Sequence, residues 1–212
     1  MARKQNRRKA SPAAAILTVL VLAALFVWRM LGSPEDGKTQ ITLPNGELHV
    51  WFLDVGQADS SLLVCDGQAM LIDGGNVDDA SYVVASLEQY GVTSLDYVIN
   101  THCDEDHVGG LAGVLAKFPA EHVLSSTAEY GTKAFSNFVK YANEQGRAIE
   151  IPSPGDTFTL GEAEITVLGP LRDYENNNEN SIVLRVDYGE TSFLFTGDMG
   201  IAAEDELVES GA

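Results

Sequence analysis

The stretch His102-Cys-Asp-Glu-Asp-His107-Val-Gly-Gly110 places four side chains that can bind a metal within six positions, namely two imidazoles and two carboxylates (His102, Asp104, Asp106 and His107). Residues 95–101 before it read as a buried strand that runs into a loop, and an apolar-periodic helix begins near Leu111. Rigid elements on both sides allow the side chains of a loop to converge on a small volume. Imidazole and carboxylate together suit Zn²⁺, Mn²⁺ or Fe better than a thiolate site would.

The structural alternative for this loop is a capped helix start. Aspartate is a good N-cap, and a helix is predicted to follow. One cap needs only one carboxylate, however, whereas two acids and two histidines are packed together here. The loop therefore favours metal binding, and two adjacent divalent ions could activate a bridging water and stabilise an attacked phosphoryl or carbonyl oxygen.

The first 33 residues differ from the rest of the chain. Residues 1–12 hold five basic residues and no acid, which predicts a basic cytoplasmic N-terminus. Residues 13–28 form an apolar run that Arg29 ends, and extension to Leu31 gives a 19-residue segment at 13–31, which at about 1.5 Å per residue is roughly enough to cross a ~30 Å hydrocarbon core. We predict a transmembrane signal-anchor with the following domain outside the cytoplasm. A cleaved signal peptide fits less well because residues 26–30 offer no small-x-small site, and a buried core helix fits less well because nothing polar makes the run amphipathic.

Residues 32–46 are a predicted linker, and residues 47–212 are a predicted folded domain. Beyond residue 33, seven Lys and Arg stand against 31 Asp and Glu, a formal charge of about −24. Such a domain repels polyanions at long range, and tight DNA binding needs basic residues that displace counterions. An acidic solvated surface is the simplest explanation. We expect Cys65 and Cys103 to be buried free thiols rather than a disulfide.

Short apolar runs separated by Gly- and Asp-containing turns predict the strands of this domain, at 48–53, 61–65, 69–72, 95–100, 122–124, 156–160, 164–168, 181–188 and 192–196. Helical spacing predicts helices at 76–90, 111–118, 132–145 and 202–209. The strands come in runs and are too many for a simple βαβ alternation. We predict an α/β (α+β) fold of two packed mixed sheets with helices on the outside.

The pattern His-x-Asp-x-Asp-His-x-Gly-Gly resembles the metal loop of metallo-β-lactamase-fold hydrolases, in the variant where aspartate replaces the second histidine. This variant is typical of the extracytoplasmic domain of ComEC/Rec2-related competence proteins and their stand-alone relatives. Four further blocks resemble the family in the same order: Leu53-Asp-Val-Gly-Gln-Ala-Asp-Ser60, Leu71-Ile-Asp-Gly-Gly75, Asn178-Glu-Asn-Ser181 and Phe195-Thr-Gly-Asp198. The resemblance implies an αββα sandwich.

The resemblance also implies a centre of two divalent ions, Zn or Mn. His102 and Asp104 would hold one ion, Asp106 and His107 the other, and Asp198 would bridge them.

Two further acids are implied around this centre. Asp73 looks like the acid behind the ligands that orients them, and Asp59 would approach the site; together with Asp106 they are the predicted catalytic residues. Turn formation beside glycine is the alternative for Asp59 and Asp73. Asn178 or Asn180 occupies the region where other branches of the fold supply a histidine.

The sequence departs from the family pattern at two places. Ala58 stands where the family usually has glycine, which changes the freedom of that turn. The family continues past Thr-Gly-Asp to a His-His-Gly-Ser block that completes the second metal site, whereas this sequence stops at Ala212. We therefore expect either a C-terminally truncated domain or an incomplete second site.

The expected function is that of a membrane-anchored, extracytoplasmic metal-dependent hydrolase. Phosphodiester bonds are the first candidate substrate, because the resemblance points to DNA processing during uptake. The expected partners are the membrane, through the N-terminal helix, and a nucleic-acid or small phosphoester substrate. Two alternatives stay open: a small-molecule metallo-hydrolase acting on a phosphoester or a lactam, and a metal-binding module without turnover.

Overall fold

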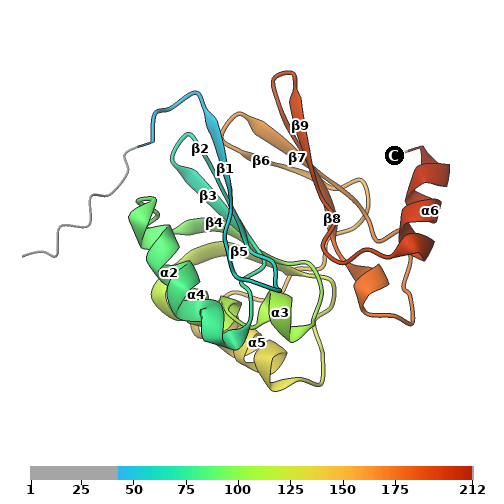
Figure 1. Ribbon diagram of the computed structural model, residues 1–212, viewed down its shortest axis with the longest axis horizontal. Coiled ribbons are helices and arrows are strands. Elements are labelled where there is room, and N and C mark those ends of the chain that lie inside the picture. The colour runs from blue at the N-terminus through green and yellow to red at the C-terminus, as the bar shows by residue number, and fades with distance from the viewer. Residues whose placement is uncertain (1–42, 212) are drawn as a thin grey trace, which may run out of the picture. The chain divides into compact units, whose positions relative to one another are not determined.

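The computed structural model describes residues 43–211, which form two stacked β-sheets with helices outside them (Figure 1). The first sheet has the order β1-β2-β3-β4-β5, in which the first three strands are antiparallel and the last three are parallel. Its strands are β1 (Leu48–Phe52), β2 (Ser61–Cys65), β3 (Gln68–Ile72), β4 (Leu95–Asn100) and β5 (Ala120–Ser125).

The second sheet is antiparallel throughout and has the order β6-β7-β8-β9. Its strands are β6 (Thr157–Leu160), β7 (Ala163–Gly169), β8 (Val183–Tyr188) and β9 (Thr191–Phe195). The prediction of two mixed sheets is thus correct for the first sheet and wrong for the second over the described residues. Two-residue turns join β6 to β7 and β8 to β9, and a connection this short can only join antiparallel strands.

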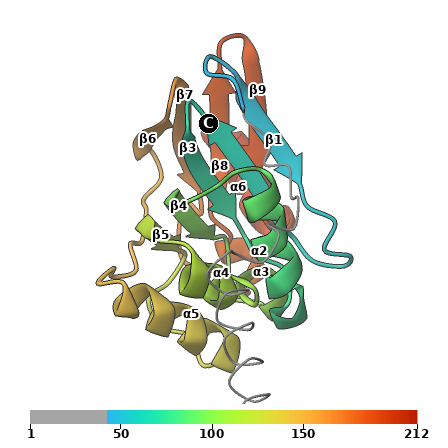
Figure 2. The ribbon, with the colours of Figure 1, turned by 90° about the vertical axis from the view of Figure 1, so that its left-hand side faces the viewer.

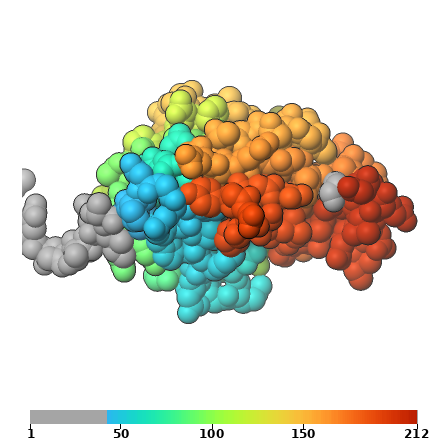
Figure 3. All heavy atoms as spheres, turned by 90° about the horizontal axis from the view of Figure 1, so that it is seen from above, coloured from blue at the N-terminus to red at the C-terminus, as the bar shows by residue number. Residues whose placement is uncertain are grey.

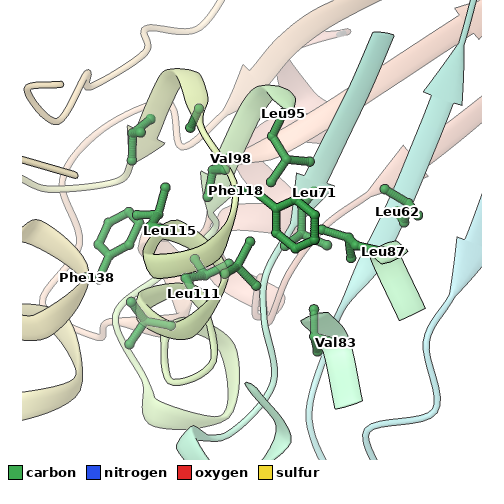
Figure 4. Packing of buried hydrophobic residues seen from close by; sticks show 14 of the residues in the cluster. Leu62, Leu71, Val83, Leu87, Leu95, Val98, Leu111, Leu115, Phe118 and Phe138 are labelled. Carbon is green, nitrogen blue, oxygen red and sulfur yellow. The ribbon is translucent and has the colours of Figure 1, made fainter. Parts of the chain in front are cut away.

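One face of the first sheet is covered by helices (Figure 2). Leu62, Leu71 and Val98 point toward this layer and are fully buried against it (Figure 4). The predicted helices are confirmed here, and the first of them begins with a short 3-10 turn. The layer consists of η1 (Val77–Asp79), α2 (Ala80–Gln89), α4 (Leu111–Lys117) and α5 (Lys133–Glu144).

The opposite face of the first sheet packs on the second sheet. Alternate residues of the same strands, Leu63, Met70 and Ile99, are buried against Ile165 and Leu184. Since side chains alternate across a strand, the apolar residues of β2 are buried on both faces of the sheet. The first and last strands, β1 and β9, lie side by side on one face (Figure 3), where the Phe52 and Phe195 ring centroids are 6.0 Å apart.

Helix α6 (Ile201–Ser210) lies on the side of the second sheet, beside β7 and the short helix η2 (Asn178–Asn180). The order of layers is therefore helix, sheet, sheet, helix, as the resemblance implied. None of the helices within residues 43–211 is long and apolar enough to cross a membrane. The predicted anchor at 13–31 and the basic segment at 1–12 lie outside the described residues.

The loop quoted from the sequence contains one helical turn, α3 (Glu105–Val108), which was expected to be irregular. Its C-terminal end packs closely on the turn after β3, where Gly74 N donates to His107 O (2.7 Å) and Gly110 N to Gly75 O (3.0 Å). A Cβ on Gly110 would collide with the carbonyl of Gly74. Glycine at this position therefore lets the two turns approach and fixes α3 against the sheet.

Candidate metal centre

The candidate site lies where several strands end. Asp73 directly follows β3, Thr101 and His102 follow β4, and Asp198 follows β9. Strands β3 and β4 are parallel neighbours, and Asp73 N donates to Ile99 O (2.8 Å), so their carboxyl ends meet. Residues after parallel strands gather in this way at one edge of a sheet. The turn that carries α3 lies at the same end (Figure 1).

His102 is the most constrained side chain of the site. It is fully buried, and its Nδ1 lies 3.2 Å from Thr101 Oγ1. The Thr101 hydroxyl donates its proton to Asp73 Oδ2 (2.7 Å), so it can only accept from His102 Nδ1–H. His102 Nε2 then carries a lone pair.

This Nε2 lone pair faces carboxylate oxygens. It lies 3.6 Å from Asp104 Oδ2 and 4.0 Å from Asp198 Oδ2, and it has no hydrogen-bond partner within the described residues. Burial lowers the pKa of His102, and the neighbouring His107 lowers it further, against the opposing effect of the carboxylates. A neutral, buried acceptor that faces two other acceptors is unfavourable on its own. A cation between them would satisfy all three groups, so the donor set fits a metal ion.

Asp73 supports both histidines from behind. Its buried carboxylate accepts from Thr101 N (2.8 Å), Thr101 Oγ1 (2.7 Å) and His107 Nδ1 (2.8 Å). Its backbone has a φ of 58°, in the left-handed region that aspartate tolerates better than most residues. Asp73 is thus a turn residue, and its carboxylate also contacts the residues that carry the site.

His107 and Asp198 approach each other from the two sheets. His107 Nε2 lies 3.3 Å from Asp198 Oδ1, while Asp198 Oδ2 faces His102. Each oxygen of one carboxylate therefore faces a different imidazole, which is the arrangement that a bridging carboxylate needs. Burial would lower the pKa of His107, but the hydrogen bond to Asp73 and the charges of Asp73, Asp198 and Asp59 outweigh it and raise the pKa to about 9.

The other three predicted site residues lie around this core. Asp104 is the N-cap residue of α3 but makes no capping hydrogen bond, so helix capping does not explain its carboxylate. Possible ligand atoms of Asp59, Asp73 and His107 lie within 4.8 Å of one another, as do those of His102, His107 and Asp198. Burial raises the pKa of Asp59.

Asp106 belongs to neither of these two clusters. Its Oδ2 accepts a hydrogen bond from Gln57 Nε2 (3.1 Å) in the first turn. The predicted pairing of Asp106 with His107 on one ion remains a prediction.

The two candidate asparagines have different surroundings. Asn178 Nδ2 lies 3.2 Å from Asp198 Oδ2, whereas the Asn180 side chain bonds to the backbone of Tyr174. Only Asn178 thus contacts the carboxylate that both histidines face. Cys65 and Cys103 are buried and free, as predicted, and burial raises the pKa of Cys103 to about 11.

Reasoning from the sequence missed three polar residues of the site: Thr101, Gln57 and Asn177. Thr101 directly precedes His102 and could have been noticed as a hydroxyl beside a predicted ligand. Gln57 lies within the quoted Asp-Val-Gly-Gln turn. Asn177 donates to Asp104 Oδ1 (2.7 Å) from a run of asparagines that reads only as a polar loop.

A cavity of about 220 Å³ adjoins the site between the first turn and β9. Its lining includes the polar residues Asp59, Asp73 and Thr101 and the apolar residues Phe52 and Leu194.

Residues 53–211 match the profile of a protein family described as the metallo-beta-lactamase superfamily. The chain belongs to this superfamily. Metallo-beta-lactamase domains typically bind divalent metals, and the two clusters described above are suitable places for them.

Among solved structures, a metallo-beta-lactamase from Staphylococcus aureus matches with a TM-score of 0.52 at 17% identity, over 79% of this chain and 51% of that one. A mutant HARLDQ-motif metallo-beta-lactamase from Cronobacter sakazakii matches with a TM-score of 0.50 at 19% identity, over 69% of this chain and 58% of that one. These matches confirm the metallo-beta-lactamase fold.

Three curated relatives confirm the resemblance to competence proteins. ComE operon protein 3 of Bacillus subtilis is 25% identical over 183 residues, which is 77% of this chain and 24% of that protein. Recombination protein 2 of Haemophilus influenzae is 30% identical over 155 residues, 69% of this chain and 18% of that protein. Competence protein ComA of Neisseria gonorrhoeae is 29% identical over 191 residues, 90% of this chain and 24% of that protein. The chain thus spans about a quarter or less of the length of these relatives.

Proposed function

We propose that the protein is a membrane-anchored, extracytoplasmic metal-dependent hydrolase that acts on phosphodiester bonds. The observation that carries this proposal is His102 Nε2, a buried acceptor without a hydrogen-bond partner that faces the carboxylates of Asp104 and Asp198. Nitrogen and oxygen donors of this kind suit Zn²⁺ or Mn²⁺.

The residues of the site have separate roles in this proposal. His102 and Asp104 would hold one ion, His107 and Asp106 would hold the second, and Asp198 would contribute to both. Asp73 keeps both imidazoles in place through its bonds to Thr101 and His107.

Two bound divalent ions would supply Lewis acidity to a phosphoryl oxygen and lower the pKa of a bound water. Asp59, whose pKa is raised by burial, lies beside His107 and the adjoining cavity. It is placed to accept or donate a proton there.

Support for a phosphodiester substrate comes from the relatives, whose names refer to competence and recombination. Support for anchoring comes from the 19-residue segment at 13–31, apolar up to Trp28, behind its basic flank. The positive flank favours a cytoplasmic N-terminus, which would leave the metal centre outside.

A small phosphoester or lactam substrate is the second candidate. The chain beyond residue 33 has a formal charge of about −24, which opposes tight binding of a polyanion. A small substrate avoids this repulsion.

The decisive experiment measures metal content and cleavage on the full-length chain. Purified protein is freed of metal, loaded with Mn²⁺ or Zn²⁺, and assayed on single-stranded DNA and on bis(p-nitrophenyl) phosphate. We expect two ions per chain and cleavage of both diesters. His102→Ala should lose at least one ion and reduce cleavage by about 100-fold or more, whereas Glu164→Gln, which removes an exposed carboxylate on β7, should behave like wild type.

Each other outcome selects a different function. Cleavage of the small diester alone would favour the small-molecule hydrolase. Two bound ions without cleavage of either diester would contradict phosphodiesterase activity and leave lactams to be tested. One ion or none, without turnover, would favour the metal-binding module.

A further inference from the structure

The segment 172–180, between β7 and β8, is fastened to helix α6 at two points. Arg172 donates through Nε (2.8 Å) and Nη2 (2.7 Å) to Glu206 Oε1, and Tyr174 OH donates to Glu206 Oε2 (2.9 Å). Near the other end, Glu179 Oε2 accepts from Ala203 N in the first turn of α6 (2.8 Å). Both ends of the segment are therefore held by one helix.

The same segment is also closed internally. Asn180 Oδ1 accepts from Tyr174 N (2.8 Å), and Asn180 Nδ2 donates to Tyr174 O (2.8 Å). These bonds span six residues and hold the intervening turn in shape. Asn177, at the centre of the turn, is thus presented from a fixed backbone.

Asn177 reaches the candidate metal centre from this turn. Its Nδ2 donates to Asp104 Oδ1 at 2.7 Å, across 73 positions of sequence. The other oxygen of that carboxylate, Oδ2, faces His102 Nε2. Asp104 is 42% exposed, and within residues 43–211 no other side chain donates a hydrogen bond to it. Without Asn177, this carboxylate would be free to rotate into solvent.

We propose that Asn177 is a positioning residue of the metal centre, which fixes the carboxylate of Asp104 so that one oxygen stays directed at the ion. The inference rests on the proposed function, since it requires Asp104 to be a ligand. An amide that donates to the outer oxygen selects one side-chain rotamer before the ion arrives. The entropy cost of ordering the Asp104 side chain is then incurred during folding rather than during metal binding, and this strengthens metal binding.

The test compares metal affinities of the full-length chain by chelator competition with Zn²⁺ and with Mn²⁺. Asn177→Leu keeps the volume of the side chain and removes the donor, and should weaken binding about 10- to 100-fold. Asn143→Leu removes an exposed asparagine on α5, away from the segment, and should change affinity less than about twofold. Asn177→Ala, which also removes the donor, provides the same comparison if the leucine variant does not fold, as judged by circular dichroism.

A double-mutant cycle with Asp104→Ala shows whether Asn177 acts through Asp104. If it does, the double variant binds metal as weakly as Asp104→Ala alone, because nothing is left to position. An Asn177→Leu affinity within about threefold of wild type, or losses that add in the double variant, would overturn the inference. If Asp104→Ala binds metal as tightly as wild type, the proposed ligand set itself is wrong. If Asp104→Ala binds metal more weakly but the Asn177 variants bind it as tightly as wild type, only the proposed role of Asn177 is wrong.

Discussion

At the scale of single residues, one buried carboxylate determines the chemistry of two histidines. Asp73 accepts a hydrogen bond from the Thr101 hydroxyl, which leaves the oxygen of that hydroxyl to accept from His102, and it accepts a hydrogen bond from His107 directly. The pKa values of the two imidazoles nevertheless shift in opposite directions. Burial lowers the pKa of His102, against the opposing charge of Asp73, whereas the hydrogen bond to Asp73 helps to raise the pKa of His107 to about 9.

The raised pKa of His107 predicts a pH-dependent stability of the metal-free protein. Folding favours the protonated form of His107. The stability that this form contributes is fully present below the unfolded pKa of about 6.5 and is lost as pH rises through about 9. We expect the free energy of unfolding to fall by roughly 3 kcal/mol across this window. Urea unfolding in a chelator between pH 6 and 10 measures the fall.

Asp73→Asn is the matched variant for this measurement. Asparagine tolerates the positive φ at this position but carries no charge to hold the imidazolium. The free energy of unfolding of this variant should therefore fall by much less across the same window, because only the charges of Asp198 and Asp59 still favour the imidazolium. An equal fall in wild type and variant would show that other groups cause it.

The candidate ligands are easier to recognise in the sequence than the polar residues that support them. Two of the four histidines of the chain lie with two aspartates at 102–107, and Asp198 follows a Thr-Gly turn. The roles of Thr101 and Asn177 depend instead on which way a hydroxyl or amide points after folding. Such orientations are set by contacts between parts of the chain that are distant in sequence, and the local sequence pattern carries no information about these contacts.

At the scale of elements, the position of α3 depends on glycines rather than on its own four residues. A helical turn this short has little stability by itself. It is held because the backbone at 109–110 lies against the turn after β3. The sequence predicted a loop here, since four residues show no helical periodicity. The helical turn depends on packing against the turn after β3, which the local sequence does not indicate.

Gly110→Ala is expected to disturb this contact. Its Cβ, whose position the backbone fixes, would collide with the backbone carbonyl of Gly74, so that neither can move without a shift of the main chain. We expect a loss of about 3 kcal/mol in the free energy of unfolding, the upper part of the range for overpacking. Gly131→Ala is the control: a Cβ there meets no atom within 4 Å, so its effect should stay within about 0.5 kcal/mol. Urea unfolding of both variants checks the difference, and equal losses would contradict it.

At the scale of the whole domain, the first sheet contributes to two apolar layers. Strand β2 is buried along its whole length, with Leu62 toward the helices and Leu63 toward the second sheet. A strand that is buried on both faces is a continuous apolar run in the sequence, and such runs predicted two packed sheets. They could not predict which strands pair, because strand order depends on long-range contacts.

Leu63→Ala tests the layer between the sheets. Leu63 is fully buried, so truncation leaves a cavity, and we expect a loss of about 2–5 kcal/mol in the free energy of unfolding. Leu194→Ala removes the same atoms from a side chain on β9 that is 57% exposed, and should cost less than about 1 kcal/mol. Chemical denaturation compares the two. A large loss at Leu194 would mean that this surface is covered in solution.

The candidate metal centre draws its donors from both halves of the sandwich. His102 and His107 follow β4, in the half that folds around the first sheet, whereas Asp198 follows β9 in the second. An ion held by all three would form a cross-link between segments about 90 residues apart. Its binding free energy would then resist separation of the two sheets, so that metal loading and cooperative unfolding of the sandwich become a single equilibrium.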